Sequence, residues 1–399
     1  MALARRSRRV LAAGRRTEIQ SRGGTWPEEG PMSMNQRIKS GLMKLAALSL
    51  TAMVAGCSAP KPRPAERDGV VQVGANTQPK ERRSTMELRR EYSNIVKQEH
   101  LLDRATKFLE AATLSESPQS RANAYEALVQ LPGTLDKVVD RGLIDENYGV
   151  RSIAAMAVGS AKLTGHSDLL RVMLGDESPF VQTAAVFALH QTGQQVDLNL
   201  LVDHLFQEED PGLRAHTAFL IGEIGDASAL PLIRDAARAP MPRALESRLK
   251  LLDLQLSEAM VKLGDESQLQ PLRAALFPAM PADLEATGLA IQALGEVGDR
   301  SSRGTLAKLS ESAGPNGELL PPEILLAIAI TMSKLGDKNG WYLADMFWES
   351  DREVVRADSA AVFGWTGRVE DLAKLERMLS DPSEMVGVAA ASGIVRRIK

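Results

Sequence analysis

Few residues of this chain have the type and spacing that chemistry needs. Its only cysteine is Cys57, so it can form neither an internal disulfide nor a metal site built from several cysteines. It lacks the catalytic and phosphate-binding motifs G-x-S-x-G, G-x-x-x-x-G-K-[ST], H-E-x-x-H and G-x-G-x-x-G. Asp337 and Asn339 imitate the start of a calcium loop, but Tyr342 and Trp348 occupy its sixth and twelfth positions. We therefore predict no enzymatic activity, no catalytic residue, no cofactor and no bound metal.

The segment that ends at Cys57 indicates a chemical use for this cysteine, as the acceptor of a lipid. The segment from Met34 reads MNQRIKSGLMKLAALSLTAMVAGC, with a positive start and an apolar stretch too short to cross a bilayer. Its end, VAGC, resembles the bacterial lipobox, in which the cysteine is acylated after cleavage. The resemblance implies a signal peptide over residues 34–56, a lipid anchor on Cys57 and, because Ser58 follows, sorting to the outer membrane with the body in the periplasm.

The segments that flank this signal peptide differ in character. Residues 1–33 are rich in arginine, as in mitochondrial transit peptides, but Glu28-Glu29-Gly30 implies a purine-rich coding run just before Met32 and Met34. We interpret residues 1–33 as an upstream extension, with translation starting at Met32 or Met34. Residues 57–84 are rich in proline, glycine and charge, which predicts a disordered tether spanning roughly 30 Å.

The composition favours helices and argues against nucleic acid as the partner. Aromatic residues make up only 4% of the 399 residues, which suits closely packed helices better than β-sheets. Residues 1–57 carry 10 Lys and Arg against 3 Asp and Glu, so residues 58–399 have a formal charge of −10. Phosphate backbones bind positively charged surfaces. We therefore predict an all-α body that does not bind nucleic acid.

Glycines recur at a spacing that indicates repeated helix pairs. Seven of them lie 28 to 39 residues apart, and four are followed by aspartate. A glycine can end a helix in the left-handed conformation, and the aspartate can cap the next helix. An apolar residue stands eight residues after each glycine, which predicts that the second helix of each pair buries the same face. The glycines are Gly165, Gly193, Gly225, Gly264, Gly298, Gly336 and Gly367, and the apolar residues are Met173, Leu201, Ile233, Leu272, Leu306, Ala344 and Leu375.

Prolines mark the expected starts of the first helices. Pro118, Pro179, Pro211 and Pro382 each follow a polar or acidic residue, as a proline in the first helical turn does. Residues 117–399 are therefore expected to form eight helix pairs and a final single helix. Residues 85–116 are expected to form a capping helix that shields the first pair.

These pairs resemble HEAT repeats, most closely the short subtype of the phycobilisome lyases. The best examples are residues 210–226, DPGLRAHTAFLIGEIGD, and residues 351–367, DREVVRADSAAVFGWTG. The resemblance implies an α-solenoid, a superhelix whose concave face binds partners and is lined by the second helices. Some HEAT-like enzymes bind two irons through His-Glu dipeptides, which this chain lacks. The repeat alone does not imply lyase activity.

Aromatic residues gather near the end of the chain. Trp341, Tyr342, Trp348 and Trp365 lie within 25 residues, and positions 341 and 348 share one helix face. One interpretation is a bulky local core, and the other is a hot spot for a protein partner. These four residues are our candidates for partner binding.

The leading functional interpretation is a lipid-anchored periplasmic scaffold or adaptor. It would bind a protein or another macromolecule on its concave face, and the sequence identifies no small-molecule substrate. The alternatives are a HEAT-like lyase or other enzyme, which needs convergent ionisable groups, and a passive structural protein of the envelope, which needs no exposed aromatic or charged cluster.

Overall fold

The computed structural model describes residues 85–399 except for 208, 279–282 and 313–318. Over this part of the chain it contains eighteen α-helices, short 3-10 turns and no strand, so the all-α prediction is confirmed. The upstream extension 1–33, the signal peptide 34–56 and the tether 57–84 with Cys57 lie outside the described residues. None of the described helices has the length and apolar character needed to cross a membrane.

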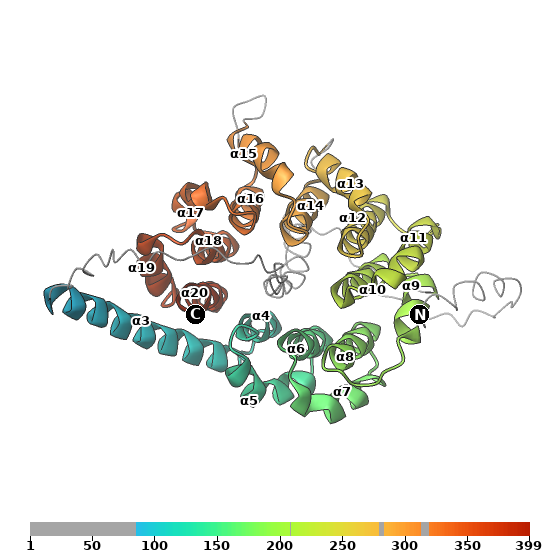
Figure 1. Ribbon diagram of the computed structural model, residues 1–399, viewed down its shortest axis with the longest axis horizontal. Coiled ribbons are helices and arrows are strands. Elements are labelled where there is room, and N and C mark those ends of the chain that lie inside the picture. The colour runs from blue at the N-terminus through green and yellow to red at the C-terminus, as the bar shows by residue number, and fades with distance from the viewer. Residues whose placement is uncertain (1–84, 208, 279–282, 313–318) are drawn as a thin grey trace, which may run out of the picture.

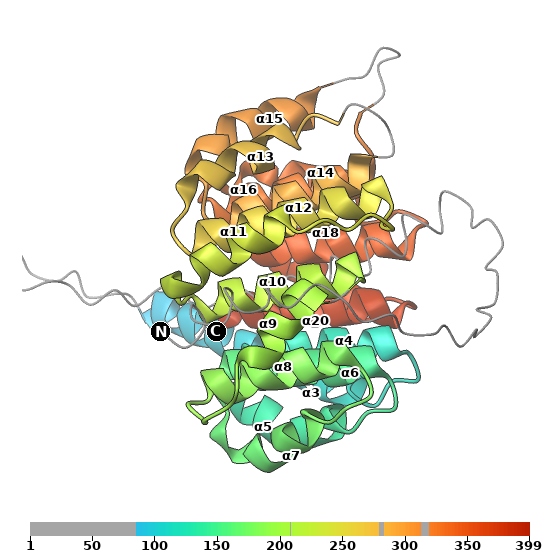
Figure 2. The same ribbon diagram turned by 90° about the vertical axis from the view of Figure 1, so that its right-hand side faces the viewer.

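The helices alternate along the chain between an inner and an outer layer (Figure 1), and the inner helices run across the thickness of the molecule (Figure 2). The inner helices are α4 (Pro118–Leu128), α6 (Tyr148–Ala161), α8 (Pro179–Gln191), α10 (Pro211–Ile224), α12 (Glu246–Lys262), α14 (Leu284–Glu296), α16 (Pro322–Lys334), α18 (Glu353–Thr366) and α20 (Glu384–Ile398). The outer helices are α5 (Pro132–Leu143), α7 (Ser167–Met173), α9 (Asn199–Gln207), α11 (Leu230–Arg238), α13 (Leu269–Ala274), α15 (Arg303–Glu311), α17 (Trp341–Phe347) and α19 (Val369–Met378).

The first helix of each pair lies on the inside of the curve, which contradicts the expectation that second helices line the concave face. The reason is size. Ala184, Ala185 and Ala188 of α8 are fully buried, and small side chains let inner helices approach closely where the circumference is shortest. The outer helices bury only one face. The seven apolar residues placed eight positions after the turn glycines are all buried, as predicted: Met173, Leu201, Ile233, Leu272, Leu306, Ala344 and Leu375.

Six of the seven turn glycines have the predicted left-handed conformation, with φ between 72° and 103°. Gly165 is the exception, because Lys162 takes that conformation at the end of α6 with a φ of 53°. The aspartates that follow four of the glycines cap the next turn, as Asp226 does by accepting a hydrogen bond from the Ser228 backbone. The other three are Asp265, Asp299 and Asp337.

Prolines begin first helices at three of the four expected sites. Pro118, Pro179 and Pro211 lie in the first turns of α4, α8 and α10. Pro382 instead lies just before Ser383, the N-cap of α20, so the prediction that it begins the helix is wrong. This proline belongs to the loop that leads into α20 and not to the first turn of the helix.

The solenoid closes into a ring, which the sequence analysis did not anticipate. The inner helix α20 packs against the first inner helix, α4. Helix α3 (Thr85–Ala112) packs on α20 as well as on α4 and so lies beside α20 as the outer helices lie beside the other inner helices. The predicted cap therefore completes a ninth pair that is built from both ends of the folded chain.

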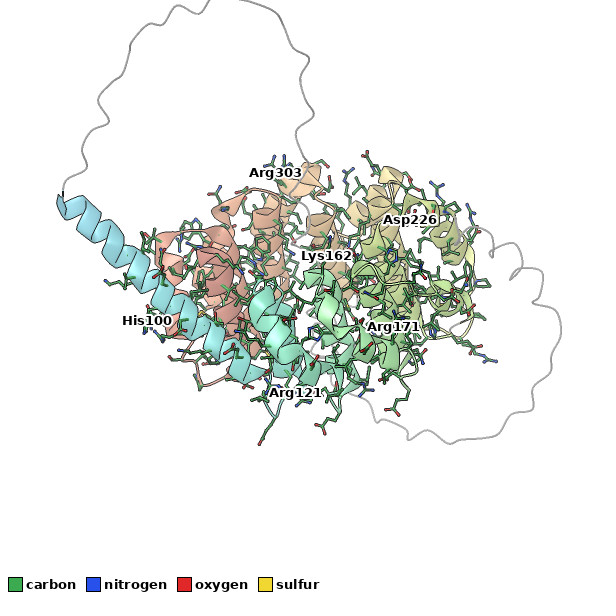
Figure 3. All side chains as sticks on the ribbon, turned by 60° about the horizontal axis from the view of Figure 1, so that its bottom comes forward. His100, Arg121, Lys162, Arg171, Asp226 and Arg303 are labelled. Carbon is green, nitrogen blue, oxygen red and sulfur yellow. The ribbon has the colours of Figure 1, made fainter. Side chains whose placement is uncertain are left out.

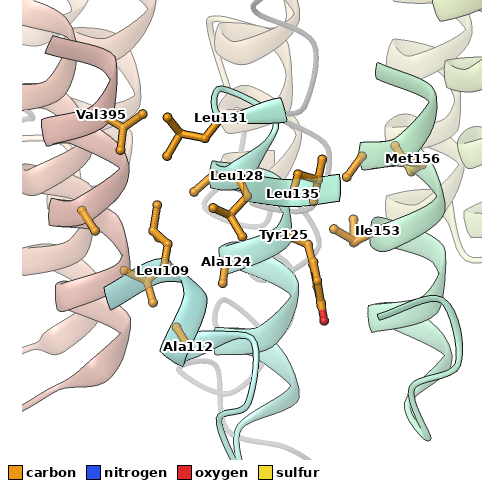
Figure 4. Close-up of a cluster of buried hydrophobic side chains, with 14 of the residues drawn as sticks. Leu109, Ala112, Ala124, Tyr125, Leu128, Leu131, Leu135, Ile153, Met156 and Val395 are labelled. Atoms are coloured by element: carbon orange, nitrogen blue, oxygen red, sulfur yellow. The ribbon is translucent and has the colours of Figure 1, made fainter. Parts of the chain in front are cut away.

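The closure has an apolar centre and a polar rim. Leu109 of α3 and Val395 of α20 are fully buried beside Leu128 of α4 (Figure 4). The ring of Phe108 lies where a side chain at Gly387 would be, so the glycine lets α3 and α20 come close. At the rim, Ser115 bonds to Glu384, the Arg104–Glu376 ion pair measures 2.8 Å, and Lys399 donates to the Gln130 carbonyl oxygen at 2.8 Å.

Candidate functional site

Three of the four aromatic candidates lie on the outer wall of the ring, on α17 and at its carboxyl end. Trp341 opens the helix, and its ring meets the ring of Tyr342 edge-on with centroids 6.3 Å apart. The Tyr342 hydroxyl lies 3.3 Å from the Ser310 Oγ of the preceding outer helix. Trp348 is the C-cap of α17. We call Trp341, Tyr342, Met346 and Trp348 the outer aromatic patch.

Cations from the following repeat cover both tryptophans of this patch. The guanidinium carbon of Arg368 lies 3.9 Å from the Trp341 ring centroid, and that of Arg377 lies 4.7 Å from the Trp348 centroid. A hydrogen bond to the buried Asp371 raises the pKa of Arg368, so this cation stays charged and fixed. Each contact contributes about 0.5–2 kcal/mol and holds the indole rigidly against the next helix pair.

Trp365 does not belong to the outer aromatic patch. It lies on the inner helix α18, between Lys334 of α16 and Arg396 of α20, whose charged groups are 5.3 and 4.4 Å from its ring centroid. The structure therefore brings together Trp341, Tyr342 and Trp348 and separates Trp365 from them.

The outer aromatic patch presents apolar surface to solvent. Tyr342 is 38% exposed and Met346, one turn further along α17, is 55% exposed. Met346 was not among the candidates, although its position four residues after Tyr342 could have indicated it. Rigid tryptophans beside an exposed tyrosine and methionine have the composition of a protein-binding hot spot, and no chemistry is needed for that role.

The inner helices carry charged side chains that pair with one another. Lys262 of α12 bonds to Glu223 at 2.5 Å and to Glu258 at 2.6 Å, and Lys334 bonds to Glu296. Burial lowers the pKa of Arg396 to about 10, against the opposing effect of nearby carboxylates. The pairs of Lys262 with Glu223 and of Lys334 with Glu296 join inner helices of successive repeats, which makes them structural supports.

Asp358 of α18 is an inner carboxyl group that its surroundings disfavour in the charged form. Burial raises its pKa to about 7, and the neighbouring Glu323 of α16 adds to that effect, whereas Arg352 opposes it.

Over the described residues, no group of three or more histidine, cysteine, aspartate or glutamate side chains is placed to hold a metal ion.

An arginine–aspartate ladder between repeats was missed by the sequence analysis. Arg121 donates from Nε and Nη2 to the two carboxylate oxygens of Asp145, at 2.8 and 2.7 Å. The same bidentate pairing recurs one repeat further on and again near the end of the chain. The other pairs are Arg151 with Asp176 and Arg356 with Asp381.

Each of these arginines lies four residues after an N-cap, and each aspartate lies two residues before the next one. That spacing was visible in the sequence and could have revealed the ladder. The aspartate also accepts a hydrogen bond from the N-cap backbone, as Asp381 does from Ser383 at 2.8 Å. At these three places the ladder locks one loop to the next.

Comparison with known proteins finds a family match over part of the chain. The family described as HEAT repeats matches residues 135–210, which run from α5 to the start of α10. Among solved structures, the chain is similar to human deoxyhypusine hydroxylase in complex with glycerol, at 16% identity over 67% of this chain and 97% of that one, with a TM-score of 0.33. It is also similar to an engineered protein, at 15% identity over 76% of this chain and 95% of that one, with a TM-score of 0.29. No functionally curated protein matches the sequence.

Proposed function

We propose that this HEAT-repeat protein is a lipid-anchored scaffold of the bacterial envelope that binds a protein partner and catalyses no reaction. Cys57 would carry the lipid in the outer membrane, and the ring would face the periplasm. The phycobilisome-lyase subtype of its repeats is a sequence resemblance, and we assign no lyase activity from it.

One observation carries the proposal of partner binding, the exposed apolar surface of the outer aromatic patch. Binding costs less when the contacting side chains are already fixed, and Arg368 and Arg377 hold Trp341 and Trp348 in place. Tyr342 beside them remains open to solvent. We therefore propose that the partner binds the outer wall of the ring and not its concave face.

A photocrosslinking amino acid at position 342, expressed in the native cell, tests this surface. We expect one discrete crosslinked protein from position 342 and none from position 172, because Val172 is 75% exposed but lies on another outer helix, outside the outer aromatic patch. Met346→Asp should abolish the product. Identical products from both positions, or none, would favour a passive envelope protein.

Truncation of the tryptophans separates a core role from a binding role. Trp341→Ala and Trp348→Ala remove rings that the next repeat covers, so we expect each to lower the free energy of unfolding by about 2–4 kcal/mol. Tyr342→Ala and Met346→Ala should leave the melting temperature nearly unchanged and still weaken capture of the partner. Equal destabilisation by all four would assign the patch to the core alone.

The lipid anchor is tested separately from the partner. Metabolic labelling with a radioactive fatty acid should mark the wild-type chain and not Cys57→Ser, which should leave the membrane fraction. Labelling of the Cys57→Ser chain would contradict acylation at this residue without affecting the crosslinking result.

A further inference from the structure

Helix α3 is longer than the part of it that contacts the ring. It spans 28 residues, and its contact with the body begins at Leu101, which is 6% exposed. Residues 94–100, which precede it, are all exposed. The amino-terminal half of the helix extends away from the body, and His100 lies near the point where it leaves (Figures 1 and 3).

The apolar stripe that seats α3 on the ring continues onto this projecting half. Ile95, Leu102 and Leu109 are seven residues apart, and in the sequence Leu88 precedes them at the same spacing. Leu109 is fully buried and Leu102 packs on the core, whereas Ile95 is 48% exposed. The neighbouring Val96 is 45% exposed. The stripe therefore runs past the edge of the ring surface that covers it.

We propose that the projecting half of α3 pairs with the same half of a second copy of this chain and so joins two rings. A seven-residue apolar spacing is the pattern by which two helices pack along each other in a left-handed supercoil. Such a stripe is complementary to itself, as the contact of a two-fold dimer must be. It is also continuous with the interface between α3 and α20 that the structure already contains.

The charge of the exposed segment favours another helix over a lipid surface. Residues 94–100 carry one lysine, Lys97, and one glutamate, Glu99, so the segment has no net formal charge to attract an anionic membrane. The projecting helix over residues 85–100 is about 24 Å long, which is too short to bury a standard interface. We therefore expect a weak dimer, with a dissociation constant in the range of about 1–100 μM.

Sedimentation velocity on a chain spanning residues 58–399, which keeps every described residue, tests the proposal. We expect the wild-type mass to rise from monomer to dimer between about 1 and 100 μM. Ile95→Asp should remain monomeric over that range. His100→Asp is the matched control, since it adds the same acid at an exposed position about 140° around the helix, and it should still form dimers.

Both variants should keep the wild-type helical circular dichroism and melting temperature, because residues 95 and 100 lie outside the contact with the ring. A wild-type chain that stays monomeric at 100 μM, or an Ile95→Asp chain that forms dimers as the wild type does, would overturn the proposal. Loss of the dimer in both variants would also overturn it. So would a monomeric wild type that sediments with phosphatidylglycerol vesicles when Ile95 is present and does not when it is replaced by aspartate. None of these outcomes depends on the partner of the outer aromatic patch.

Discussion

At the scale of single residues, the ladder of arginine–aspartate pairs sets how firmly successive repeats hold together. The Arg356 side chain also donates to the Ser350 carbonyl oxygen at 2.8 Å, so one guanidinium ties its own loop to the next. Removing one partner of a largely buried ion pair leaves the other charge without compensation, which costs more than an exposed pair ever contributes.

Arg356→Gln is therefore expected to lower the free energy of unfolding by about 2–4 kcal/mol at neutral pH in urea denaturation. Arg238→Gln is the control, because Arg238 is 77% exposed and pairs with Asp235 at 3.5 Å; its effect should stay below about 0.5 kcal/mol. Equal losses in the two variants would contradict the role of the ladder.

The ladder also predicts a dependence on pH. The hydrogen bond from Arg356 holds the pKa of Asp381 below its ordinary value. The ionised aspartate therefore stabilises the fold fully at pH values above the ordinary pKa of about 3.9. That contribution is lost as the pH falls from there through the depressed pKa. The stability of Arg356→Gln should therefore fall less steeply on acidification than that of the wild type.

Asp358 predicts the opposite dependence. Burial raises the pKa of this carboxyl to about 7, so its folded form binds a proton more tightly than its unfolded form does. Stability falls as the pH rises from about 4 to about 7, because the carboxyl group must then ionise in the folded chain. Asp358→Asn removes this cost and should raise the free energy of unfolding by roughly 1–3 kcal/mol at pH 8, with little change at pH 4.

The control for Asp358→Asn is Asp168→Asn, at an exposed position of α7. Its thermal unfolding should match the wild type at both pH values. A stabilisation of Asp358→Asn that is the same at pH 4 and pH 8 would show that the carboxyl group is not the cause.

At the scale of helices, the sequence could predict the pairs but not their placement in the ring. Glycines and aspartates specify turns locally, so Gly225 and Asp226 act as expected. Which helix of a pair lies inside depends on packing between repeats, and the sequence carries only an indirect signal for it, the small residues of the first helices such as Ala184, Ala185 and Ala188. The closure had a signal that went unused. Ser115-Glu116-Ser117-Pro118 after α3 parallels Asp176-Glu177-Ser178-Pro179 after the second helix α7.

The candidate site shows the same division. Helical spacing put Trp341 and Trp348 on one face, and the structure has them at the start of α17 and at its C-cap, whereas the separation of Trp365 followed from the alternation of inner and outer helices. The cations that cover the tryptophans come from later in the chain, so only the folded structure could reveal them.

Gly387→Leu tests the packing of α3 against α20. The new side chain would overlap the ring of Phe108, and such overpacking costs about 1–3 kcal/mol. We expect faster hydrogen exchange in α3 and α20 and unchanged exchange in α10 and α12 on the far side of the ring. Gly304→Leu, on α15 where no atom lies within 4 Å of the new Cβ, should leave exchange in α3 unchanged.

At the scale of the whole molecule, closure removes the free ends that an open solenoid has. In an open array each terminal repeat lacks one neighbour and frays first, whereas here the inner helices α4 and α20 each have a neighbour on both sides. The ring also fixes where the outer aromatic patch and the projecting half of α3 lie relative to one another, because both belong to one continuous body.

Closure is tested most directly by the distance between spin labels at positions 104 and 376, in a chain carrying Cys57→Ser. Arg104 and Glu376 are 272 residues apart in the sequence, and their side chains meet at 2.8 Å across the junction of α3 with the last repeats. A closed ring predicts one short, narrow distance set by this contact and the two label arms. A long or broad distribution, with the helical content intact, would show an open solenoid and contradict the account.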